Sequence, residues 1–237
     1  MSNIIYTIRD LFNYPVESTL LIAAIIFSLF CSIRVKMTFS KYNLVRTANG
    51  AKAHEVARRI LDINGLYDVQ IMQVAGNLTD HYNPKTKVLA LSQTVFGNST
   101  VAAVGVAAHE CGHAIQHAKQ YTPIMIRQTI YPAVAFCSQT WPIVFMVGCI
   151  LGLLPVVQVA IGFFIVVALF QLITLPVEID ASKRAINTLV DNKILYGTEL
   201  LGARKVLGAA AMTYVSSFLV TLAQLFKLLA KTNRKNN

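Results

Sequence analysis

The sequence contains no Asp, Glu, Lys or Arg between Arg127 and Glu178. Charged residues are scarce in the whole chain, at 14%, against about 25% in typical soluble domains, and hydrophobic residues make up 55%. An uncharged stretch of this length is sufficient for two membrane crossings of about 20 residues each. These shortages exclude an ordinary soluble domain and predict a mainly α-helical, multi-pass membrane protein.

We expect three or four transmembrane helices. Two of them occupy the uncharged stretch, at approximately 131–152 and 154–175. A shorter apolar run at 18–33 is followed by Arg34 and Lys36, whose long side chains can reach the membrane interface. The positive charges follow this run rather than precede it, and no small-residue cleavage site closes it, so we expect an anchor with its N-terminus outside rather than a cleaved signal peptide.

Acidic residues are also few, with 11 Asp and Glu against 21 Lys and Arg. Eleven of the basic residues lie in 34–127 and five in 183–205, which is the bias of loops that face an anionic cytoplasmic leaflet. We therefore expect a single membrane-embedded domain, 1–237, with cytoplasmic catalytic parts at approximately 34–127 and 176–205. The hydropathy excludes a basic nucleic-acid-binding protein.

A further run at 206–226 is long enough for a fourth span. A full crossing would place the basic tail that follows it outside the cell, which conflicts with the charge bias of the other loops. The tail contains Lys227, Lys231, Arg234 and Lys235. The sequence leaves the fourth crossing open.

The stretch after the first span has the pattern of a small α+β, zincin-like part. A helix is expected over 47–66, followed by strands at 67–76 and 87–92 that alternate or concentrate apolar residues. Asn-Ser-Thr then offers a cap to a helix that begins at Val101 and ends before Pro123. We expect the two strands to form a short antiparallel sheet.

The helix that begins at Val101 carries the sequence HECGH. Residues four apart lie on one helix face, so His109 and His113 can direct two imidazoles at a single zinc ion. Glu110 projects about 100° further round the helix, which suits a carboxylate that contacts the activated water rather than the ion. A second His-Glu pair at 54–55 has Arg58 in place of the second His and cannot bind a metal in this way.

A catalytic zinc ion needs a third protein ligand and an open position. His117 lies about 12 Å along the helix from His109 and cannot reach the same ion. Acidic residues reappear after the spans at Glu178 and Asp180, two positions apart, so that on a helix only one of them can bind the metal. We favour Glu178, because Asp180 is as well explained as a helix-terminal ion-pair residue.

On these residues the chain resembles the YugP-like membrane zinc metallopeptidases and, more distantly, the HtpX-type membrane proteases, both of the gluzincin type. The resemblance covers nearly the full length: the zinc motif, the pair of spans, the acid after them, and a hairpin-like segment at 77–92. It implies that Glu178 is the third ligand. It also implies that strand 87–92 is a sheet edge along which an extended peptide binds. The substrate-binding residues would then include Asn77, Val88, Leu89, Ala90 and Leu91.

This chain departs from the family pattern at one position. Many gluzincins have Asp four residues after the third ligand, where this chain has Ser182. The carboxylate expected there is therefore either absent or supplied by Asp180.

The predicted function is that of a membrane-bound zinc metalloendopeptidase with one Zn²⁺ per chain, cleaving membrane or membrane-near polypeptides at the cytoplasmic face. Glu110 would take a proton from the attacking water and pass it to the leaving amine. Candidates for stabilising the oxyanion are Tyr82, His81, Asn77 and Tyr214, although packing or turn chemistry explains each of them better. The alternative is a membrane protein that binds or transports metal without peptidase activity, although the predicted spans lack the ionisable residues typical of transporters.

Overall fold

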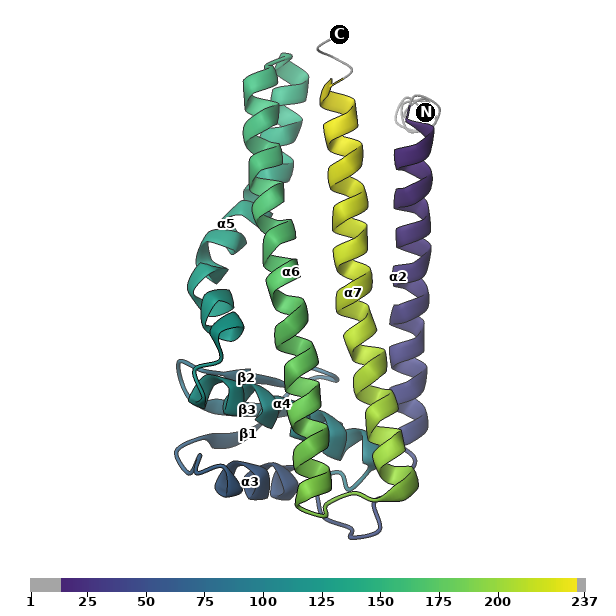
Figure 1. The fold of residues 1–237 in the computed structure, drawn as a ribbon, viewed down its shortest axis with the longest axis vertical. Coiled ribbons are helices and arrows are strands. Elements are labelled where there is room, and N and C mark those ends of the chain that lie inside the picture. The colour runs from purple at the N-terminus through teal and green to yellow at the C-terminus, as the bar shows by residue number, and fades with distance from the viewer. Residues whose placement is uncertain (1–13, 234–237) are drawn as a thin grey trace. The chain divides into compact units, whose positions relative to one another are not determined.

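The computed structural model describes residues 14–233, which form a mainly helical fold with one small sheet (Figure 1). In chain order the elements are α2 (Pro15–Tyr42), α3 (Ala53–Ile63), β1 (Gln70–Val74), β2 (His81–Asn83), β3 (Val88–Ser92), α4 (Val101–Ala118), α5 (Thr122–Leu151), α6 (Leu154–Asp191) and α7 (Gly197–Asn233). Within the described residues, α2, α5, α6 and α7 are each long and apolar enough to cross a membrane. The expectation of a multi-pass helical protein is confirmed, and the run at 206–226 lies within the fourth candidate span. Arg34 and Lys36 belong to α2, whereas Arg234 and Lys235 lie outside the described residues.

The chain divides into two compact units. The first unit comprises Met1–Cys31, Ile126–Thr174 and Tyr214–Asn237, and so holds the most apolar portions of the long helices. The second comprises Ser32–Met125 and Leu175–Thr213, and contains α3, the sheet, α4 and the adjoining ends of α6 and α7.

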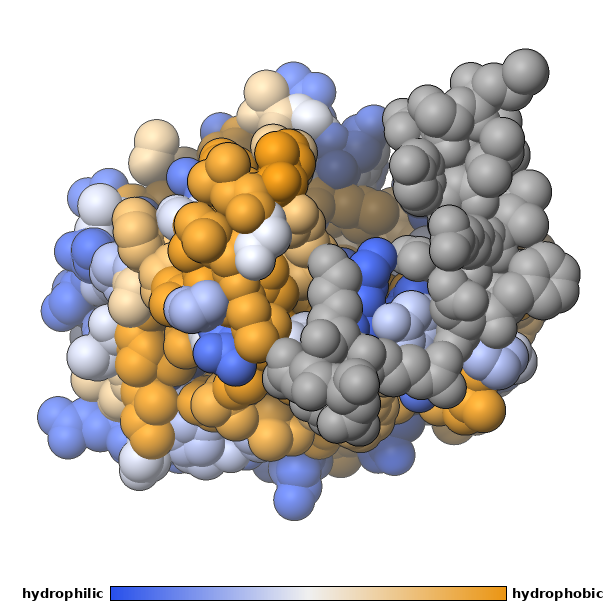
Figure 2. Space-filling model, turned by 90° about the horizontal axis from the view of Figure 1, so that it is seen from above, coloured by the Kyte–Doolittle hydropathy of each residue, from blue (hydrophilic) through white to orange (hydrophobic). Residues whose placement is uncertain are grey.

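The first unit exposes many large apolar side chains. Ile26, Phe136 and Ile150 are 62%, 60% and 74% exposed, and Figure 2 shows hydrophobic residues over a continuous area at the centre of the view. Soluble monomers rarely expose apolar area on this scale, so these helix surfaces are suited to lipid. α6 has 38 residues and is about 57 Å long, nearly twice the thickness of a bilayer core, so it reaches well beyond the hydrocarbon.

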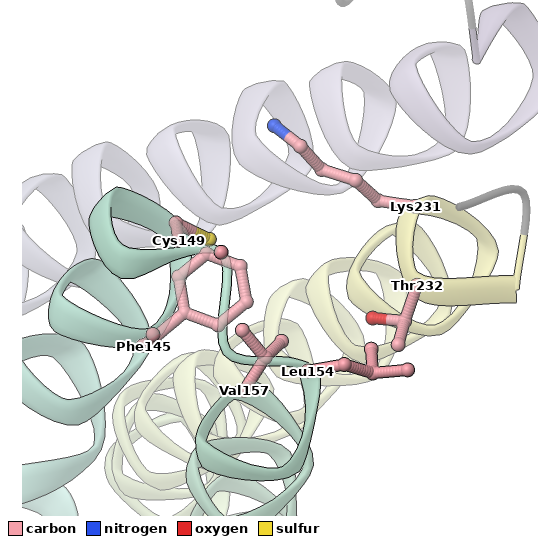
Figure 3. Close-up of a pocket in the computed structure, with 8 residues that line it drawn as sticks. Phe145, Cys149, Leu154, Val157, Lys231 and Thr232 are labelled. Carbon is pink, nitrogen blue, oxygen red and sulfur yellow. The ribbon is translucent and has the colours of Figure 1, made fainter. Parts of the chain in front are cut away.

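A cavity of about 150 Å³ lies within the first unit, beside the turn between α5 and α6 (Figure 3). Phe145, Leu154 and Val157 give it an apolar wall, and Thr232 comes from the last turn of α7. All its lining residues belong to the first unit, so it is not part of the predicted zinc site.

The second unit has a core between α3, the sheet and α4. Ile60 and Leu61 of α3, Leu89 and Leu91 of β3 and Val104 of α4 are completely buried in it. The start of α4 is fixed as expected, since the Thr100 side chain accepts a hydrogen bond from the backbone N–H of Ala103. This core holds α4 firmly within its unit.

α4 also lies very close to α6 within the second unit. A Cβ atom placed on Gly112 would come within 2.5 Å of the carbonyl oxygen of Ala181. Only glycine permits this separation of the two backbones, and the helix that carries the HECGH motif therefore faces the part of α6 that carries the acids.

The sheet differs from the expected antiparallel pair because it is mixed and has the order β1-β3-β2. β1 and β3 run parallel, with Ile71 opposite Leu89, while β2 pairs antiparallel with β3. β2 has three residues and no apolar alternation, which is why the sequence pattern did not reveal it. β2 pairs with one edge of β3 and β1 with the other, and residues 75–87 between β1 and β3 are long enough for the crossover that parallel pairing requires.

Candidate metal centre

Three predicted ligands meet where α4 passes α6. The Nε2 atom of His109 is 3.3 Å, and that of His113 is 3.5 Å, from Oε2 of Glu178. The two imidazole rings lie edge to face with centroids 4.7 Å apart, as expected for residues one helical turn apart that point at a common centre. Among the described residues, these three form the group whose ligand atoms all lie within 4.8 Å of one another.

The donor set fits a zinc ion. Tetrahedral zinc with bonds of about 2.0–2.2 Å holds its ligand atoms about 3.3–3.5 Å apart, which matches both measured nitrogen–oxygen separations. Two imidazoles and one carboxylate are also the donor types that catalytic zinc takes from proteins. The arrangement can therefore hold a metal ion.

Each imidazole is oriented by a hydrogen bond on its other nitrogen. Nδ1 of His109 lies 3.1 Å from Oγ of Ser182, and Nδ1 of His113 lies 3.0 Å from Oε1 of Gln116. Such partners hold the ring in place and leave Nε2 directed at the ion. Ser182 thus occupies the position of the missing carboxylate and contacts His109 with a hydroxyl instead.

Asp180 does not join the three ligands. Its Oδ2 accepts hydrogen bonds from Nε2 of Gln116 and from Nε of Arg184. The structure therefore brings Glu178 rather than Asp180 to the two imidazoles, and the pairing of Asp180 with Arg184 is the alternative that the sequence left open for it.

The carboxylates around His113 favour positive charge at the centre. Burial alone would lower the pKa of His113, but the hydrogen bond to Glu178 and the charge of Glu110 outweigh it and raise that pKa above its ordinary value. Glu110 is itself 7% exposed, so its carboxylate is held inside the site region rather than in solvent. Cys111 lies within the same motif, but burial raises the pKa of its thiol and Sγ is 3.6 Å from the Ala57 carbonyl oxygen, so it is no thiolate ligand.

His117 has a separate partner, as its distance along the helix predicted. Its Nδ1 is 3.2 Å from the hydroxyl of Tyr82 on β2. Of the other oxyanion candidates, His81 is exposed and bonded to the carbonyl of Thr79, and Asn77 is exposed in the loop before β2. Tyr214 belongs to the first unit.

The second His-Glu pair has a structural role. Nδ1 of His54 is 2.7 Å from the carbonyl of Phe96, and the two rings stack 4.4 Å apart. Glu55 accepts a hydrogen bond from the backbone N–H of Lys52 at the start of α3. The pair therefore stabilises the start of α3.

The expectation that strand 87–92 forms a sheet edge is wrong. β3 is the central strand, paired with β1 along its whole length and with β2 over its first three residues. Leu89, Ala90 and Leu91 are also at most 2% exposed. Val88, Leu89, Ala90 and Leu91 therefore have no free backbone edge for a peptide, and the open edges of this sheet belong to β1 and β2. Asn77 lies in the exposed loop between these two strands.

Comparison with known proteins agrees with this geometry, since residues 18–233 match the family model described as "Putative neutral zinc metallopeptidase". The chain belongs to this family. It is 44% identical over 208 residues to the "Putative membrane protease YugP" of Bacillus subtilis (strain 168), covering 88% of this chain and 92% of the relative. No solved structure matches the chain.

Proposed function

We propose that the protein is a membrane-bound, zinc-dependent metalloendopeptidase of the gluzincin type, with one zinc ion held by His109, His113 and Glu178. The observation that carries this proposal is the convergence of the three ligand atoms from α4 and α6 at separations suited to zinc. A zinc ion bound there would supply Lewis-acid activation of water and of the scissile carbonyl. The membership of a zinc peptidase family supports the same reaction.

Glu110 is the proposed general base. It follows His109 directly on α4, is buried, and is not one of the three grouped ligands, and its charge contributes to the raised pKa of His113. It would accept a proton from the attacking water and donate it to the leaving amine. A protein that only binds or transports metal would have no use for this carboxylate.

The proposed substrates are membrane or membrane-near polypeptides, cleaved at the cytoplasmic face. The second unit consists largely of the segments between α2 and α5 and between α6 and α7, and it contains most of the basic residues. Loops rich in Lys and Arg remain in the cytoplasm during membrane insertion. A site tied to helices of this length would meet polypeptides close to the bilayer.

The test compares the purified wild type in detergent with Glu110→Gln, measuring bound zinc by mass spectrometry and cleavage of casein and of a membrane protein. We expect the variant to retain zinc and to lose cleavage by about 10²–10⁴-fold, the usual contribution of a general base. Glu55→Gln is the matched control, because Glu55 also follows a His but only caps α3. Full cleavage by the zinc-loaded Glu110→Gln protein would rule out the proposed mechanism and favour a metal-binding protein without peptidase activity.

A further inference from the structure

Gln116 connects the two helices that carry the metal ligands. It lies on α4 one turn after His113 and is completely buried. Its Oε1 is 3.0 Å from Nδ1 of His113, and its Nε2 is 2.8 Å from both the carbonyl oxygen of Val177 and Oδ2 of Asp180. One side-chain amide therefore links a ligand on α4 to residues on either side of Glu178 on α6.

These contacts allow only one orientation of the amide. The NH₂ group has two hydrogens, and two acceptors are placed to receive them, the Val177 carbonyl and the Asp180 carboxylate. The reversed amide would bring its oxygen against both of these oxygens, with no hydrogen in either contact. Oε1 must therefore face His113, and because a carbonyl oxygen only accepts, Nδ1 of His113 must carry the hydrogen.

We propose that Gln116 is a positioning residue that keeps His113 in the Nδ1–H tautomer, so that the lone pair of Nε2 is directed at the metal. The proposal rests on the metal site described above. In the neutral imidazole one nitrogen donates and the other accepts, so fixing the hydrogen on Nδ1 makes Nε2 the only nitrogen that can bind an ion.

Asp180 keeps the amide in this orientation. Its carboxylate is paired with Nε of Arg184, whose guanidinium lies 5.6 Å from the centre of the Tyr121 ring. Oδ2 of Asp180 thus accepts hydrogen bonds from both Arg184 and Gln116. A continuous set of contacts thus runs from Tyr121 through Arg184, Asp180 and Gln116 to His113.

The other imidazole is held differently. The partner of His109 Nδ1 is the hydroxyl of Ser182, which can donate as well as accept. Ser182 therefore holds the ring of His109 without determining which nitrogen carries the hydrogen. The two ligands should respond unequally when their partners are removed.

The first experiment measures zinc affinity of the full-length protein in detergent by competition with a chromogenic chelator. Gln116→Leu keeps the size of the side chain but removes the amide, and we expect affinity to fall by about 10–100-fold, as for other partners of metal-bound His. Ser182→Ala should lower zinc affinity by a smaller factor. Asp62→Asn is the matched control for changes at Asp180, because Asp62 forms the same i,i+4 pair with Arg58 on α3.

A double substitution tests whether zinc affinity depends on the hydrogen bonds of the Gln116 amide or only on the size of the side chain. Gln116→Glu combined with Asp180→Asn exchanges the amide and the carboxylate, so position 116 still accepts from His113 and still bonds to position 180, although the Val177 carbonyl loses the hydrogen bond that it accepts from Gln116. We expect zinc affinity above that of Gln116→Leu, because His113 keeps its acceptor, and below that of the wild type, because the Val177 carbonyl loses its donor.

The decisive readout is the ring N–H of His113 itself. In the Co²⁺-loaded protein, the exchangeable Nδ1–H protons of the two bound His are observable as paramagnetically shifted ¹H NMR signals that vanish in D₂O. We expect the His113 signal in the wild type and in the exchanged double variant, and its loss to solvent exchange in Gln116→Leu. A role confined to helix packing would leave the signal unchanged in every variant that folds.

The outcomes separate the two proposals. Wild-type affinity and an unchanged N–H signal in Gln116→Leu would overturn the role of Gln116 while leaving the metal site intact. A wild type that binds neither Zn²⁺ nor Co²⁺ would overturn the proposed function, and the role of Gln116 with it.

Discussion

A single hydrogen atom at Gly112 determines how closely α4 can approach α6. A methyl group there would lie 2.5 Å from the Ala181 carbonyl oxygen and 3.1 Å from its carbon, both backbone atoms that a rotamer change cannot move. We expect Gly112→Ala to destabilise the protein by about 1–3 kcal/mol, the usual cost of overpacking, and to weaken zinc binding because His113 is displaced from Glu178. Thermal unfolding and zinc titration measure the two effects.

Gly105 on the same helix provides the control for this prediction. A Cβ atom there would meet the Ala203 side chain at 3.5 Å, which is an ordinary contact. Gly105→Ala should therefore be neutral, or more stable by up to about 1 kcal/mol through helix propensity, with unchanged zinc binding. Equal effects of the two substitutions would show that the short approach to Ala181 is not what limits position 112.

For single residues, the sequence predicts those site positions that depend on spacing along one helix. His109, Glu110 and His113 follow from the HECGH motif and helical periodicity, whereas Glu178 is separated from them by α5 and the first part of α6 and was favoured through elimination and family resemblance. Gln116 gave no such signal. A Gln near two His in an apolar helix is noticeable, but its burial and its bonds to Val177 and Asp180 depend on how α6 packs, which no local pattern contains.

Among the elements, a bound metal would act as a crosslink between α4 and α6, since two ligands come from one helix and the third from the other. An ion that binds only the folded state at 100 times its Kd adds about 2.7 kcal/mol to the free energy of unfolding. We expect chelation to lower the melting temperature of the wild type and zinc to restore it. Glu178→Ala should show a much smaller response, and an equal response would mean that the stabilising ion binds elsewhere.

The parallel pairing of β1 with β3 makes a prediction about alternate residues of β1. The N–H of Gln70 donates to the Lys87 carbonyl, so the N–H of Met72 also faces β3 and that of Gln73 faces the open edge. Both side chains are exposed. Met72→Pro should destabilise the protein by about 1–3 kcal/mol more than Gln73→Pro, because it leaves a ladder carbonyl unsatisfied. Chemical unfolding compares the two, and the opposite order would contradict the register.

The elements show the same division between local and distant causes. The start of α4 follows from the Thr100 cap and its end lies before Pro123, so both were predictable. The strand order was not, because the three residues of β2 carry no periodic signal and no local pattern shows that β1 pairs with β3 rather than with β2. The expectation that β3 is an edge strand was wrong for this reason.

At the scale of the whole molecule, the basic residues predict the orientation in the membrane. Eleven lie in 34–127 and five in 183–205, out of 21 Lys and Arg, and with four crossings these segments fall on one side while the α5–α6 turn, the start of α2 and the end of α7 fall on the other. The positive-inside rule places the first side in the cytoplasm. The basic end of α7 then faces outward, a cost that the larger charge of the other loops outweighs.

Two single cysteines test this orientation in a Cys149→Ser background, which removes the half-buried native thiol beside the α5–α6 turn. Leu153→Cys lies in that turn and Tyr196→Cys in the turn between α6 and α7, at side chains that are 46% and 59% exposed. In intact cells, a membrane-impermeant maleimide should label position 153 and spare position 196 until the cells are opened, because α6 separates the two by one crossing. The reverse pattern would place the candidate metal centre outside the cytoplasm, and labelling of both in intact cells would mean that α6 does not cross.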